Sequence, residues 1–245
     1  MKKKKELSII LPVYNEKESL GVFVKVLDSI ITFNYEIIIV YDFKKDNTVL
    51  EGKKLQKLYK NIKLVHNNLG PGIKNAIIFG KKFCKYDNIL LTTVDEIFPI
   101  IAFDKMLDLI VYKNYDMVSG TRYNLGGKRL GGSFIGKFLS YFANKSFVFL
   151  TSFPISDLTT GIKMFKKNIL EQISFKNRSN GWVFAFELSI KAFLLNKKIG
   201  EIGLLSVDRL FGGASTFKPI PWIKDYFKCY WWGLINIYKK KITKK

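Results

Sequence analysis

Carboxylates follow two of the apolar runs in the first part of the chain, and they are the first residues whose placement suggests chemistry. Asp42 follows a run that ends EIIIVY, and Asp95 and Glu96 follow another that ends LLTTV. A carboxylate at such a position can accept hydrogen bonds from a ribose or a nucleobase, or it can bind a hard cation such as Mg²⁺ or Mn²⁺. Two plainer interpretations compete, namely a solvated turn for Asp95 with Glu96 and a helix cap for residues 46–48.

The first apolar run ends in the sequence PVYNE at residues 12–16. Pro12 can end a strand, Tyr14 offers a flat ring, and Glu16 can hydrogen-bond a base or a ribose. The same letters also suit an ordinary turn that caps a following helix.

The second half of the chain contains scattered cationic and polar groups that suit phosphate oxygens. Arginine forks pair well with phosphate, and hydroxyls can support them. Taken one at a time, each residue is equally well explained as a surface or salt-bridging group. The candidates are Arg122, Lys128, Arg129, Asp157, Thr160, Arg209, Ser215 and Lys218.

The elements that must position these residues alternate between strand and helix. We expect strands at 7–13, 36–40, 62–66, 88–94 and 116–120, and helices at 17–31, 48–59, 73–83 and 103–112. Such alternation predicts an α/β fold with a parallel sheet and ligands at the carboxyl ends of its strands. The second half is less regular, with helices expected at 133–150 and 184–196 and a strand at 201–207.

Composition limits the class of protein. The chain has 245 residues, of which 48% are hydrophobic, so a globular fold is expected. Its net charge of +21 favours an anionic partner, although a Lys-, Ile-, Asn- and Phe-rich genome is an alternative cause. No helix-turn-helix, zinc-finger or RNP pattern is visible, so nucleic acid is not the expected partner. Cys84 and Cys229 lack metal or redox spacing and predict reduced cytosolic thiols.

The last residues, 219–245, read PIPWIKDYFKCYWWGLINIYKKKITKK and place aromatic residues at helical spacing before a group of lysines. Aromatic and basic residues together suit the headgroup region of an anionic membrane surface. A helix packed on residues 1–218, or one that contacts a membrane-protein partner, is the alternative. We see no signal peptide and no apolar stretch of spanning length, which predicts a cytoplasmic protein on the cytoplasmic face of the membrane.

The order of these motifs resembles family 2 glycosyltransferases. The resemblance begins with PVYNE, EIIIVYD and NNLG and covers about residues 7–220. The later motifs are GTRY from residue 120, GG at 126, DLTTG from 157 and DR at 208 followed by GGAS. These look like the dolichol-phosphate (polyprenyl-phosphate) mannosyltransferase branch.

The resemblance implies a GT-A fold over residues 1–218 and a role for each matching position. Pro12, Tyr14 and Glu16 would contact a nucleotide, with Asp42 at its base or ribose. Asp95, helped by Glu96, would bind Mg²⁺ or Mn²⁺. The expected catalytic group is Asp157, Arg122, Arg129 and Arg209, with Ser215 and Lys218 binding substrate. Within this group, Arg122 and Arg129 would bind substrate phosphates, and Asp157 would lie near the reacting groups.

The implied reaction moves a sugar, with inversion, from a GDP- or UDP-sugar to a polyprenyl phosphate. The alternatives are transfer to a saccharide acceptor in glycan synthesis and a non-catalytic nucleotide-sugar-binding homologue. Two departures from the family pattern motivate the second alternative. Tyr41 replaces the first of two adjacent Asp residues, and Thr93 replaces the first Asp of the Asp-x-Asp motif.

Overall fold

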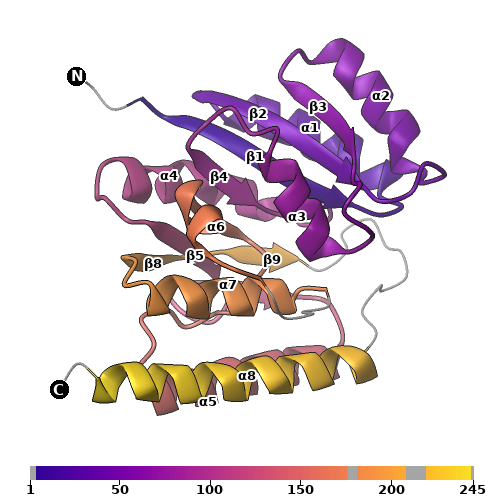
Figure 1. Ribbon diagram of the computed structural model, residues 1–245. Helices are drawn as coiled ribbons and strands as arrows, with labels where there is room; N and C mark the ends of the chain where they lie inside the picture. The colour runs from indigo at the N-terminus through magenta and orange to yellow at the C-terminus, as the bar shows by residue number, and fades with distance from the viewer. Residues whose placement is uncertain (1–3, 176–180, 208–218, 244–245) are drawn as a thin grey trace.

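The computed structural model describes residues 4–175, 181–207 and 219–243 of the chain. Over these residues the main sheet has seven strands in the order β3-β2-β1-β4-β7-β5-β8, with helices on both faces (Figure 1). The expected α/β architecture, a mostly parallel sheet flanked by helices, is confirmed.

The first half follows the predicted alternation closely. Its elements are β1 (Glu6–Val13), α1 (Lys17–Ile30), β2 (Asn34–Tyr41), α2 (Thr48–Leu58), β3 (Ile62–His66), α3 (Ile73–Lys81), β4 (Asn88–Leu91), the 3₁₀ helix η1 (Phe98–Ala102) and α4 (Phe103–Val111). β1 pairs in parallel with β2 and β4, and β2 pairs in parallel with β3. The near-continuous apolar runs form strands here because both faces of the sheet are covered.

The second half departs from simple alternation. Its elements are β5 (Met117–Thr121), β6 (Lys128–Leu130), α5 (Phe134–Thr151), β7 (Lys163–Lys166), α6 (Asn168–Gln172), α7 (Val183–Leu194), β8 (Ile199–Gly203), β9 (Leu205–Val207) and α8 (Pro219–Ile242). β7 lies between β4 and β5 and is antiparallel to both. The strand expected at 201–207 was wrong as a single element, because β8 pairs with β5 while β9 pairs with β6.

Two apolar clusters hold the layers together. One packs α1 and α4 on a face of the sheet through residues such as Phe23 and Phe103, both fully buried. The other packs α3, α6 and α7 on the opposite face and includes Phe165 and Phe186. Nine of the 12 residues of α7 are buried because the helix lies between the sheet and α8 (Figure 1).

The helices α5 and α8 lie side by side on the outside of the α7 layer (Figure 1). Hydrogen bonds join them, from Tyr230 Oη to Ser146 Oγ at 2.9 Å, from Tyr238 Oη to the Leu150 carbonyl at 2.7 Å, and from Lys241 Nζ to the Thr151 carbonyl at 2.9 Å. Partners on the two helices ascend together in sequence, so the helices run in the same direction. Among the described residues, no helix is both long enough and apolar enough to cross a membrane.

Candidate functional site

The first three strands end in register at one edge of the sheet. Tyr41 of β2 lies opposite Val13 of β1 on one side and His66 of β3 on the other. The loops that follow these strands, including the one that begins at Asp42, therefore emerge side by side. This is the carboxyl edge of the parallel strands, where the sequence predicted the site.

Asp42 is fixed by the loop after β3. Its Oδ1 accepts a hydrogen bond from Asn67 Nδ2 at 2.8 Å, and its Oδ2 accepts one from the backbone N–H of Gly72 at 2.8 Å. Gly72 has a φ of +120°, a conformation that disfavours any side chain. Asn67, which the sequence contributed only as part of a motif, is thus the side chain that orients Asp42.

The loop that carries Tyr14 is anchored to the start of α2. The Asp46 carboxylate accepts hydrogen bonds at 3.1 Å from the N–H of Asn15 and at 2.8 Å from that of Thr48, whose Oγ1 accepts one from the N–H of Glu16 at 2.8 Å. Residues 46–48 therefore cap the start of α2 through Asp46, as one interpretation of the sequence proposed, and they also hold the loop after β1 in place. The Tyr14 ring is half-exposed and makes an edge contact with Phe43, at 5.9 Å between centroids.

Asp95 and Glu96 follow β4, on the other side of β1 from Asp42. Leu91, the last residue of β4, lies opposite Ile10 of β1, so the chain leaves β4 at the same carboxyl edge. Both carboxylates, Asp42 and Asp95, thus belong to one rim, as the sequence predicted. Pro12, which pairs with Val40, is the penultimate residue of β1 at this rim.

The donor set on this rim fits a divalent ion that takes most of its ligands from a substrate. Among the described residues, no three His, Cys, Asp or Glu side chains gather into a metal-binding group. The Thr93 hydroxyl, at the first position of the metal motif, is buried with no hydrogen-bond partner. Asp95 and Glu96 can supply carboxylate oxygens, and Mg²⁺ commonly binds through one or two carboxylates together with water and phosphate.

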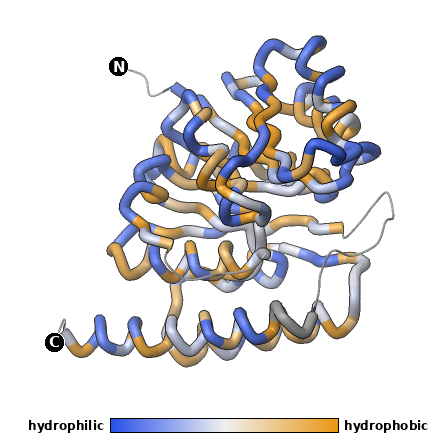
Figure 2. The backbone as a smooth tube through the Cα atoms, turned by 45° about the vertical axis from the view of Figure 1, so that its right-hand side comes forward, coloured by the Kyte–Doolittle hydropathy of each residue, from blue (hydrophilic) through white to orange (hydrophobic). Residues whose placement is uncertain are grey.

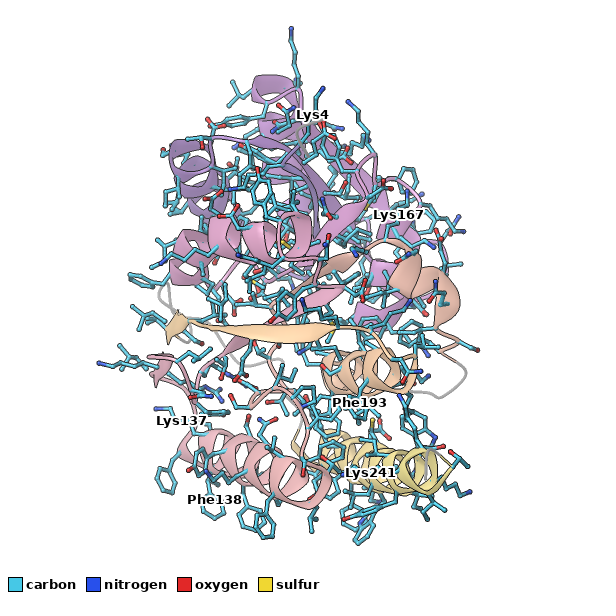
Figure 3. All side chains as sticks on the ribbon, turned by 90° about the vertical axis from the view of Figure 1, so that its left-hand side faces the viewer. Lys4, Lys137, Phe138, Lys167, Phe193 and Lys241 are labelled. Carbon is cyan, nitrogen blue, oxygen red and sulfur yellow. The ribbon has the colours of Figure 1, made fainter. Side chains whose placement is uncertain are left out.

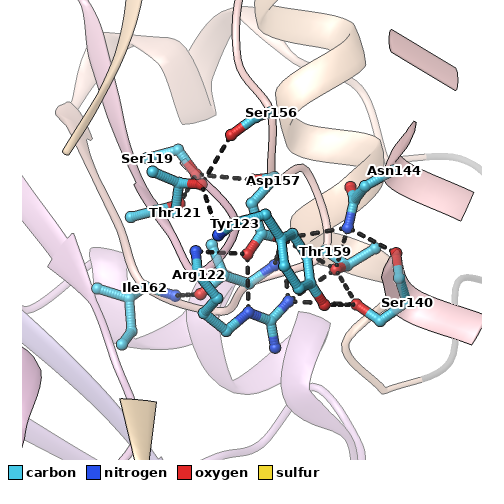
Figure 4. Close-up of polar contacts among 12 residues, drawn as sticks. Ser119, Thr121, Arg122, Tyr123, Ser140, Asn144, Ser156, Asp157, Thr159 and Ile162 are labelled. Carbon is cyan, nitrogen blue, oxygen red and sulfur yellow. Dashed lines mark hydrogen bonds and ion pairs between the residues drawn. The ribbon is translucent and has the colours of Figure 1, made fainter. Parts of the chain in front are cut away.

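Arg122 and Asp157 form a buried ion pair at the end of β5 (Figure 4). Arg122 donates from Nε to Asp157 Oδ2 at 2.7 Å and from Nη2 to Oδ1 at 2.9 Å, and its backbone N–H also donates to Oδ2 at 3.2 Å. The Asp157 side chain is fully buried and that of Arg122 is 9% exposed. Two parallel hydrogen bonds of this kind are among the strongest in proteins.

Further donors surround the Asp157 carboxylate. Its Oδ1 also accepts from Asn144 Nδ2 at 3.3 Å, from Thr159 Oγ1 at 3.0 Å and from the N–H of Thr160 at 3.2 Å. Burial raises the pKa of Asp157, but the charge of Arg122, the hydrogen bonds from its side chain and backbone, and the charge of Lys163 lower it by more, so the net shift is downward. A carboxylate so occupied holds a loop in place and is poorly suited to remove a proton from a substrate.

Two residues of α5 connect this pair to the outer helix layer. Ser140 Oγ accepts a hydrogen bond from Tyr123 Oη at 2.9 Å and lies 2.8 Å from Thr159 Oγ1 (Figure 4). Asn144 Oδ1 accepts from the N–H of Leu158 at 2.8 Å. Neither residue was predicted to belong to the site, although an asparagine within the apolar stretch FLSYFANKSFVFL was a usable signal.

The charge of Glu96, which follows β4, acts on Arg122, which follows β5. Burial lowers the pKa of the Arg122 guanidinium, but the charge of Asp157 and, to a smaller extent, the charge of Glu96 raise it. Glu96 and Arg122 therefore interact through their charges, although β7 lies between β4 and β5.

Lys163 of β7 lies beneath this pair and was not predicted. Its side chain is fully buried, and its Nζ donates to Ser119 Oγ at 2.8 Å, while Ser119 Oγ donates to the Asp157 carbonyl at 3.2 Å. Burial is the main cause that lowers the pKa of Lys163 to about 7; the charge of Arg122 also lowers it, while Asp157 and Glu201 raise it.

Stability is expected to depend on pH through Lys163. Above pH 7 the folded protein has a neutral Lys163, whereas the unfolded chain keeps this proton up to a pKa of about 10.4. Because the unfolded state then binds more protons, the free energy of unfolding rises with pH in this window, by at most about 1.4 kcal/mol per pH unit. Lys163→Met should remove that slope in urea unfolding measured between pH 7 and 9. Lys166→Met, a change on the same strand at a partly exposed position, should keep it; equal slopes in wild type and Lys163→Met would contradict the prediction.

The remaining predicted residues are less closely tied to this cluster. Arg129 is a half-buried residue of β6, opposite Ser206 of β9. Arg209, Ser215 and Lys218 lie outside the described residues, so their predicted roles stay predictions.

Comparison with known proteins gives consistent results. A profile described as "Glycosyl transferase family 2" matches residues 8–174. A dolichol-phosphate mannosyltransferase from Pyrococcus furiosus is 31% identical over 55% of this chain, but the match spans only 38% of that protein. A dolichyl-phosphate hexose transferase from Haloferax volcanii is 24% identical over 88% of this chain and 92% of its own length.

Solved structures support the fold. Glucosyl-3-phosphoglycerate synthase from Mycobacterium tuberculosis, in complex with phosphoglyceric acid, superposes with a TM-score of 0.69 at 15% identity, over 95% of this chain and 80% of that one. A second structure of that enzyme, in complex with Mn²⁺, UDP and glucosyl-3-phosphoglycerate, gives a TM-score of 0.66 at 14% identity over the same shares of the two chains. The expected GT-A fold is thereby confirmed.

Proposed function

The chain belongs to glycosyl transferase family 2, and we propose that it moves a sugar from a nucleoside diphosphate to a phosphate oxygen of a polyprenyl lipid. In this reaction the acceptor oxygen forms a bond to the anomeric carbon from the face opposite the leaving group, which inverts the configuration. The bond from that carbon to the diphosphate breaks, and the nucleoside diphosphate departs with the electron pair. The proteins with the names dolichol-phosphate mannosyltransferase and dolichyl-phosphate hexose transferase support this acceptor class.

The observation that carries the proposal is that both oxygens of the Asp157 carboxylate already accept hydrogen bonds within the protein. Every oxygen of this buried carboxylate already accepts hydrogen bonds from Arg122 and its neighbours. A sugar hydroxyl as acceptor requires a base to remove its proton, whereas a phosphate monoester is ionised near neutral pH and requires none. A phosphate acceptor therefore matches a site in which the Asp157 carboxylate holds a loop in place and is not available as a base.

The other residues act by position and charge. Asp42, Tyr14 and Glu16 would hold the base and ribose at the rim, with Asp46 keeping their loop in place. A Mg²⁺ or Mn²⁺ ion bound by Asp95 and Glu96 would neutralise charge on the diphosphate. Arg129, with Arg209, would face the acceptor phosphate. Such preorganised charge is a large source of catalysis in general.

The C-terminal helix suits work at a membrane. The aromatic and basic α8 is present as predicted, and an acceptor lipid requires the protein to reach a bilayer. We therefore propose a peripheral position on the cytoplasmic face, where nucleotide sugars are available.

The proposal predicts sugar transfer that depends on the acceptor phosphate. UDP- and GDP-sugars would be incubated with a polyprenyl phosphate and, as the matched control, with the same polyprenyl alcohol, and products followed by mass spectrometry. We expect a glycosylated lipid from the phosphate only. Transfer to saccharides instead would contradict the acceptor class, and nucleotide-sugar binding without consumption would indicate a non-catalytic homologue.

A further inference from the structure

The helix α5 exposes an unusual amount of apolar surface for one that lies on a folded domain. Only Asn144, Phe147 and Thr151 of its 18 residues are buried. The exposed large apolar side chains include Phe134 at 82% and Phe149 at 85%. The others on this helix are Ile135, Phe138, Leu139, Tyr141, Phe142 and Leu150.

The neighbouring helix α8 continues this surface. Its exposed apolar residues recur at intervals of three or four positions, which places them on one side of the helix. These residues are Ile223, Phe227, Trp231, Ile235, Tyr238 and Ile242. Figure 2 shows that hydrophobic positions recur along both helices although the pair lies on the outside of the molecule.

Charge on the two helices is almost entirely positive. Lys137 and Lys145 belong to α5, which has no acidic residue, and Asp225 is the single acid of α8. The lysines of α8 are Lys224, Lys228, Lys239, Lys240 and Lys241. In Figure 3 Phe138 lies at the outer edge of α5, with Lys137 nearer the body of the protein.

We propose that α5 and α8 together form one docking face for an anionic lipid bilayer, with Phe138, Phe142 and Phe149 of α5 inserted among the headgroups. Aromatic side chains with exposed lysines such as Lys145, Lys224 and Lys228 on the same helices match a negatively charged interface, where each basic residue near the surface adds attraction. Neither helix can span a bilayer, so both would lie in the plane of the membrane. The inference extends the proposed function, in which α8 alone was assigned to the surface.

Docking through α5 has a consequence for the site. The side of α5 opposite the exposed phenylalanines carries Ser140 and Asn144, which hydrogen-bond to the loop that holds Asp157. Contact with the bilayer would therefore hold the Arg122–Asp157 pair at a fixed distance from the headgroups, on the protein side of the membrane surface. A lipid whose phosphate lies at the membrane surface would meet the site without leaving the bilayer.

Vesicle flotation of the full chain tests the proposal independently of sugar transfer. The vesicles would contain phosphatidylcholine alone or with phosphatidylglycerol. We expect binding that requires phosphatidylglycerol, and a loss on the order of tenfold or more in the triple variant Phe138→Ser, Phe142→Ser, Phe149→Ser, because each exposed ring contributes apolar area. The matched control is Leu50→Ser with Leu58→Ser, two exposed residues of α2 on a distant part of the fold, and it should bind as wild type does.

Several outcomes would overturn the inference. Unchanged vesicle binding in the α5 triple variant would assign the contact to α8 alone or to a protein partner. A wild-type dimer that dissociates in this variant, with vesicle binding retained, would show that the face joins two copies of the chain. Failure of sugar transfer with normal flotation would reject the proposed function and leave the docking face intact.

Discussion

Replacing Asp157 with alanine is expected to lower the free energy of unfolding by about 3–5 kcal/mol and to abolish sugar transfer. The stability loss follows from the Arg122 guanidinium, which is buried and would lose its only carboxylate among the described ion pairs. Removing one partner of a buried pair leaves an uncompensated charge, which costs far more than the pair itself contributes. Urea unfolding at pH 7, with transfer rates measured on the folded fraction, would give both values.

A double variant separates charge from packing. Asp157→Leu combined with Arg122→Met removes both charges while keeping much of the volume, so it should recover a large part of the stability lost in Asp157→Ala. Transfer should stay absent in the double variant, because the loop at 156–160 would lose the hydrogen bonds that the Asp157 carboxylate accepts from Asn144 of α5 and from Thr159. A loss of less than about 1 kcal/mol in Asp157→Ala would contradict the assigned role of the pair.

The first half of the fold was predictable because its signals are local. Strands such as 7–13 and 36–40 are buried on both faces, so their sequences are continuous apolar runs that end at a polar residue. Parallel pairing then requires that Asp42 and Asp95 leave the sheet at one edge. This argument needs the order of elements and no side-chain contact, so it could be made from the sequence.

The second half was less predictable because its structure depends on distant partners. β7 reads KMFK, which looks like an exposed, charged segment, yet it lies between β4 and β5 and buries Lys163. The pairing of Arg122 with Asp157 joins residues 35 positions apart. The sequence predicted that both residues belong to one site, but it could not show that the guanidinium and the carboxylate would bind each other.

The pairing changes how the site is expected to work. The resemblance assigned Arg122 to substrate phosphate, whereas the structure shows its guanidinium bound to Asp157, Ser140 and Thr159. Arg122 still contributes positive charge near Glu96 and the rim. Its role in phosphate binding stays a prediction, as does that of the half-buried Arg129.

Asp95→Asn is expected to reduce transfer at least about a hundredfold and to remove the effect of divalent metal on nucleotide binding. Asp95 matches the last acid of the family's metal motif, and Thr93 offers a neutral hydroxyl where the family has the first acid. With so few protein ligands, loss of one carboxylate should leave too little charge to hold the ion. Charge stabilisation by a metal is worth several kcal/mol, and each 1.36 kcal/mol corresponds to tenfold in rate.

Thermal unfolding can test this without relying on activity. In wild type, UDP or GDP should raise the melting temperature more with Mn²⁺ than without it, because ligands that bind the native state stabilise it by mass action. Asp95→Asn should lose the increment due to Mn²⁺ and keep the one due to nucleotide alone. Asp42→Asn is the matched control on the same rim and should weaken nucleotide binding equally with and without metal, because Asp42 contacts Asn67 and Gly72 rather than the motif at β4. If Asp95→Asn kept the full Mn²⁺ increment, the ion would have to bind elsewhere, and the rim formed by β1, β2 and β4 would lose its assignment as the diphosphate site.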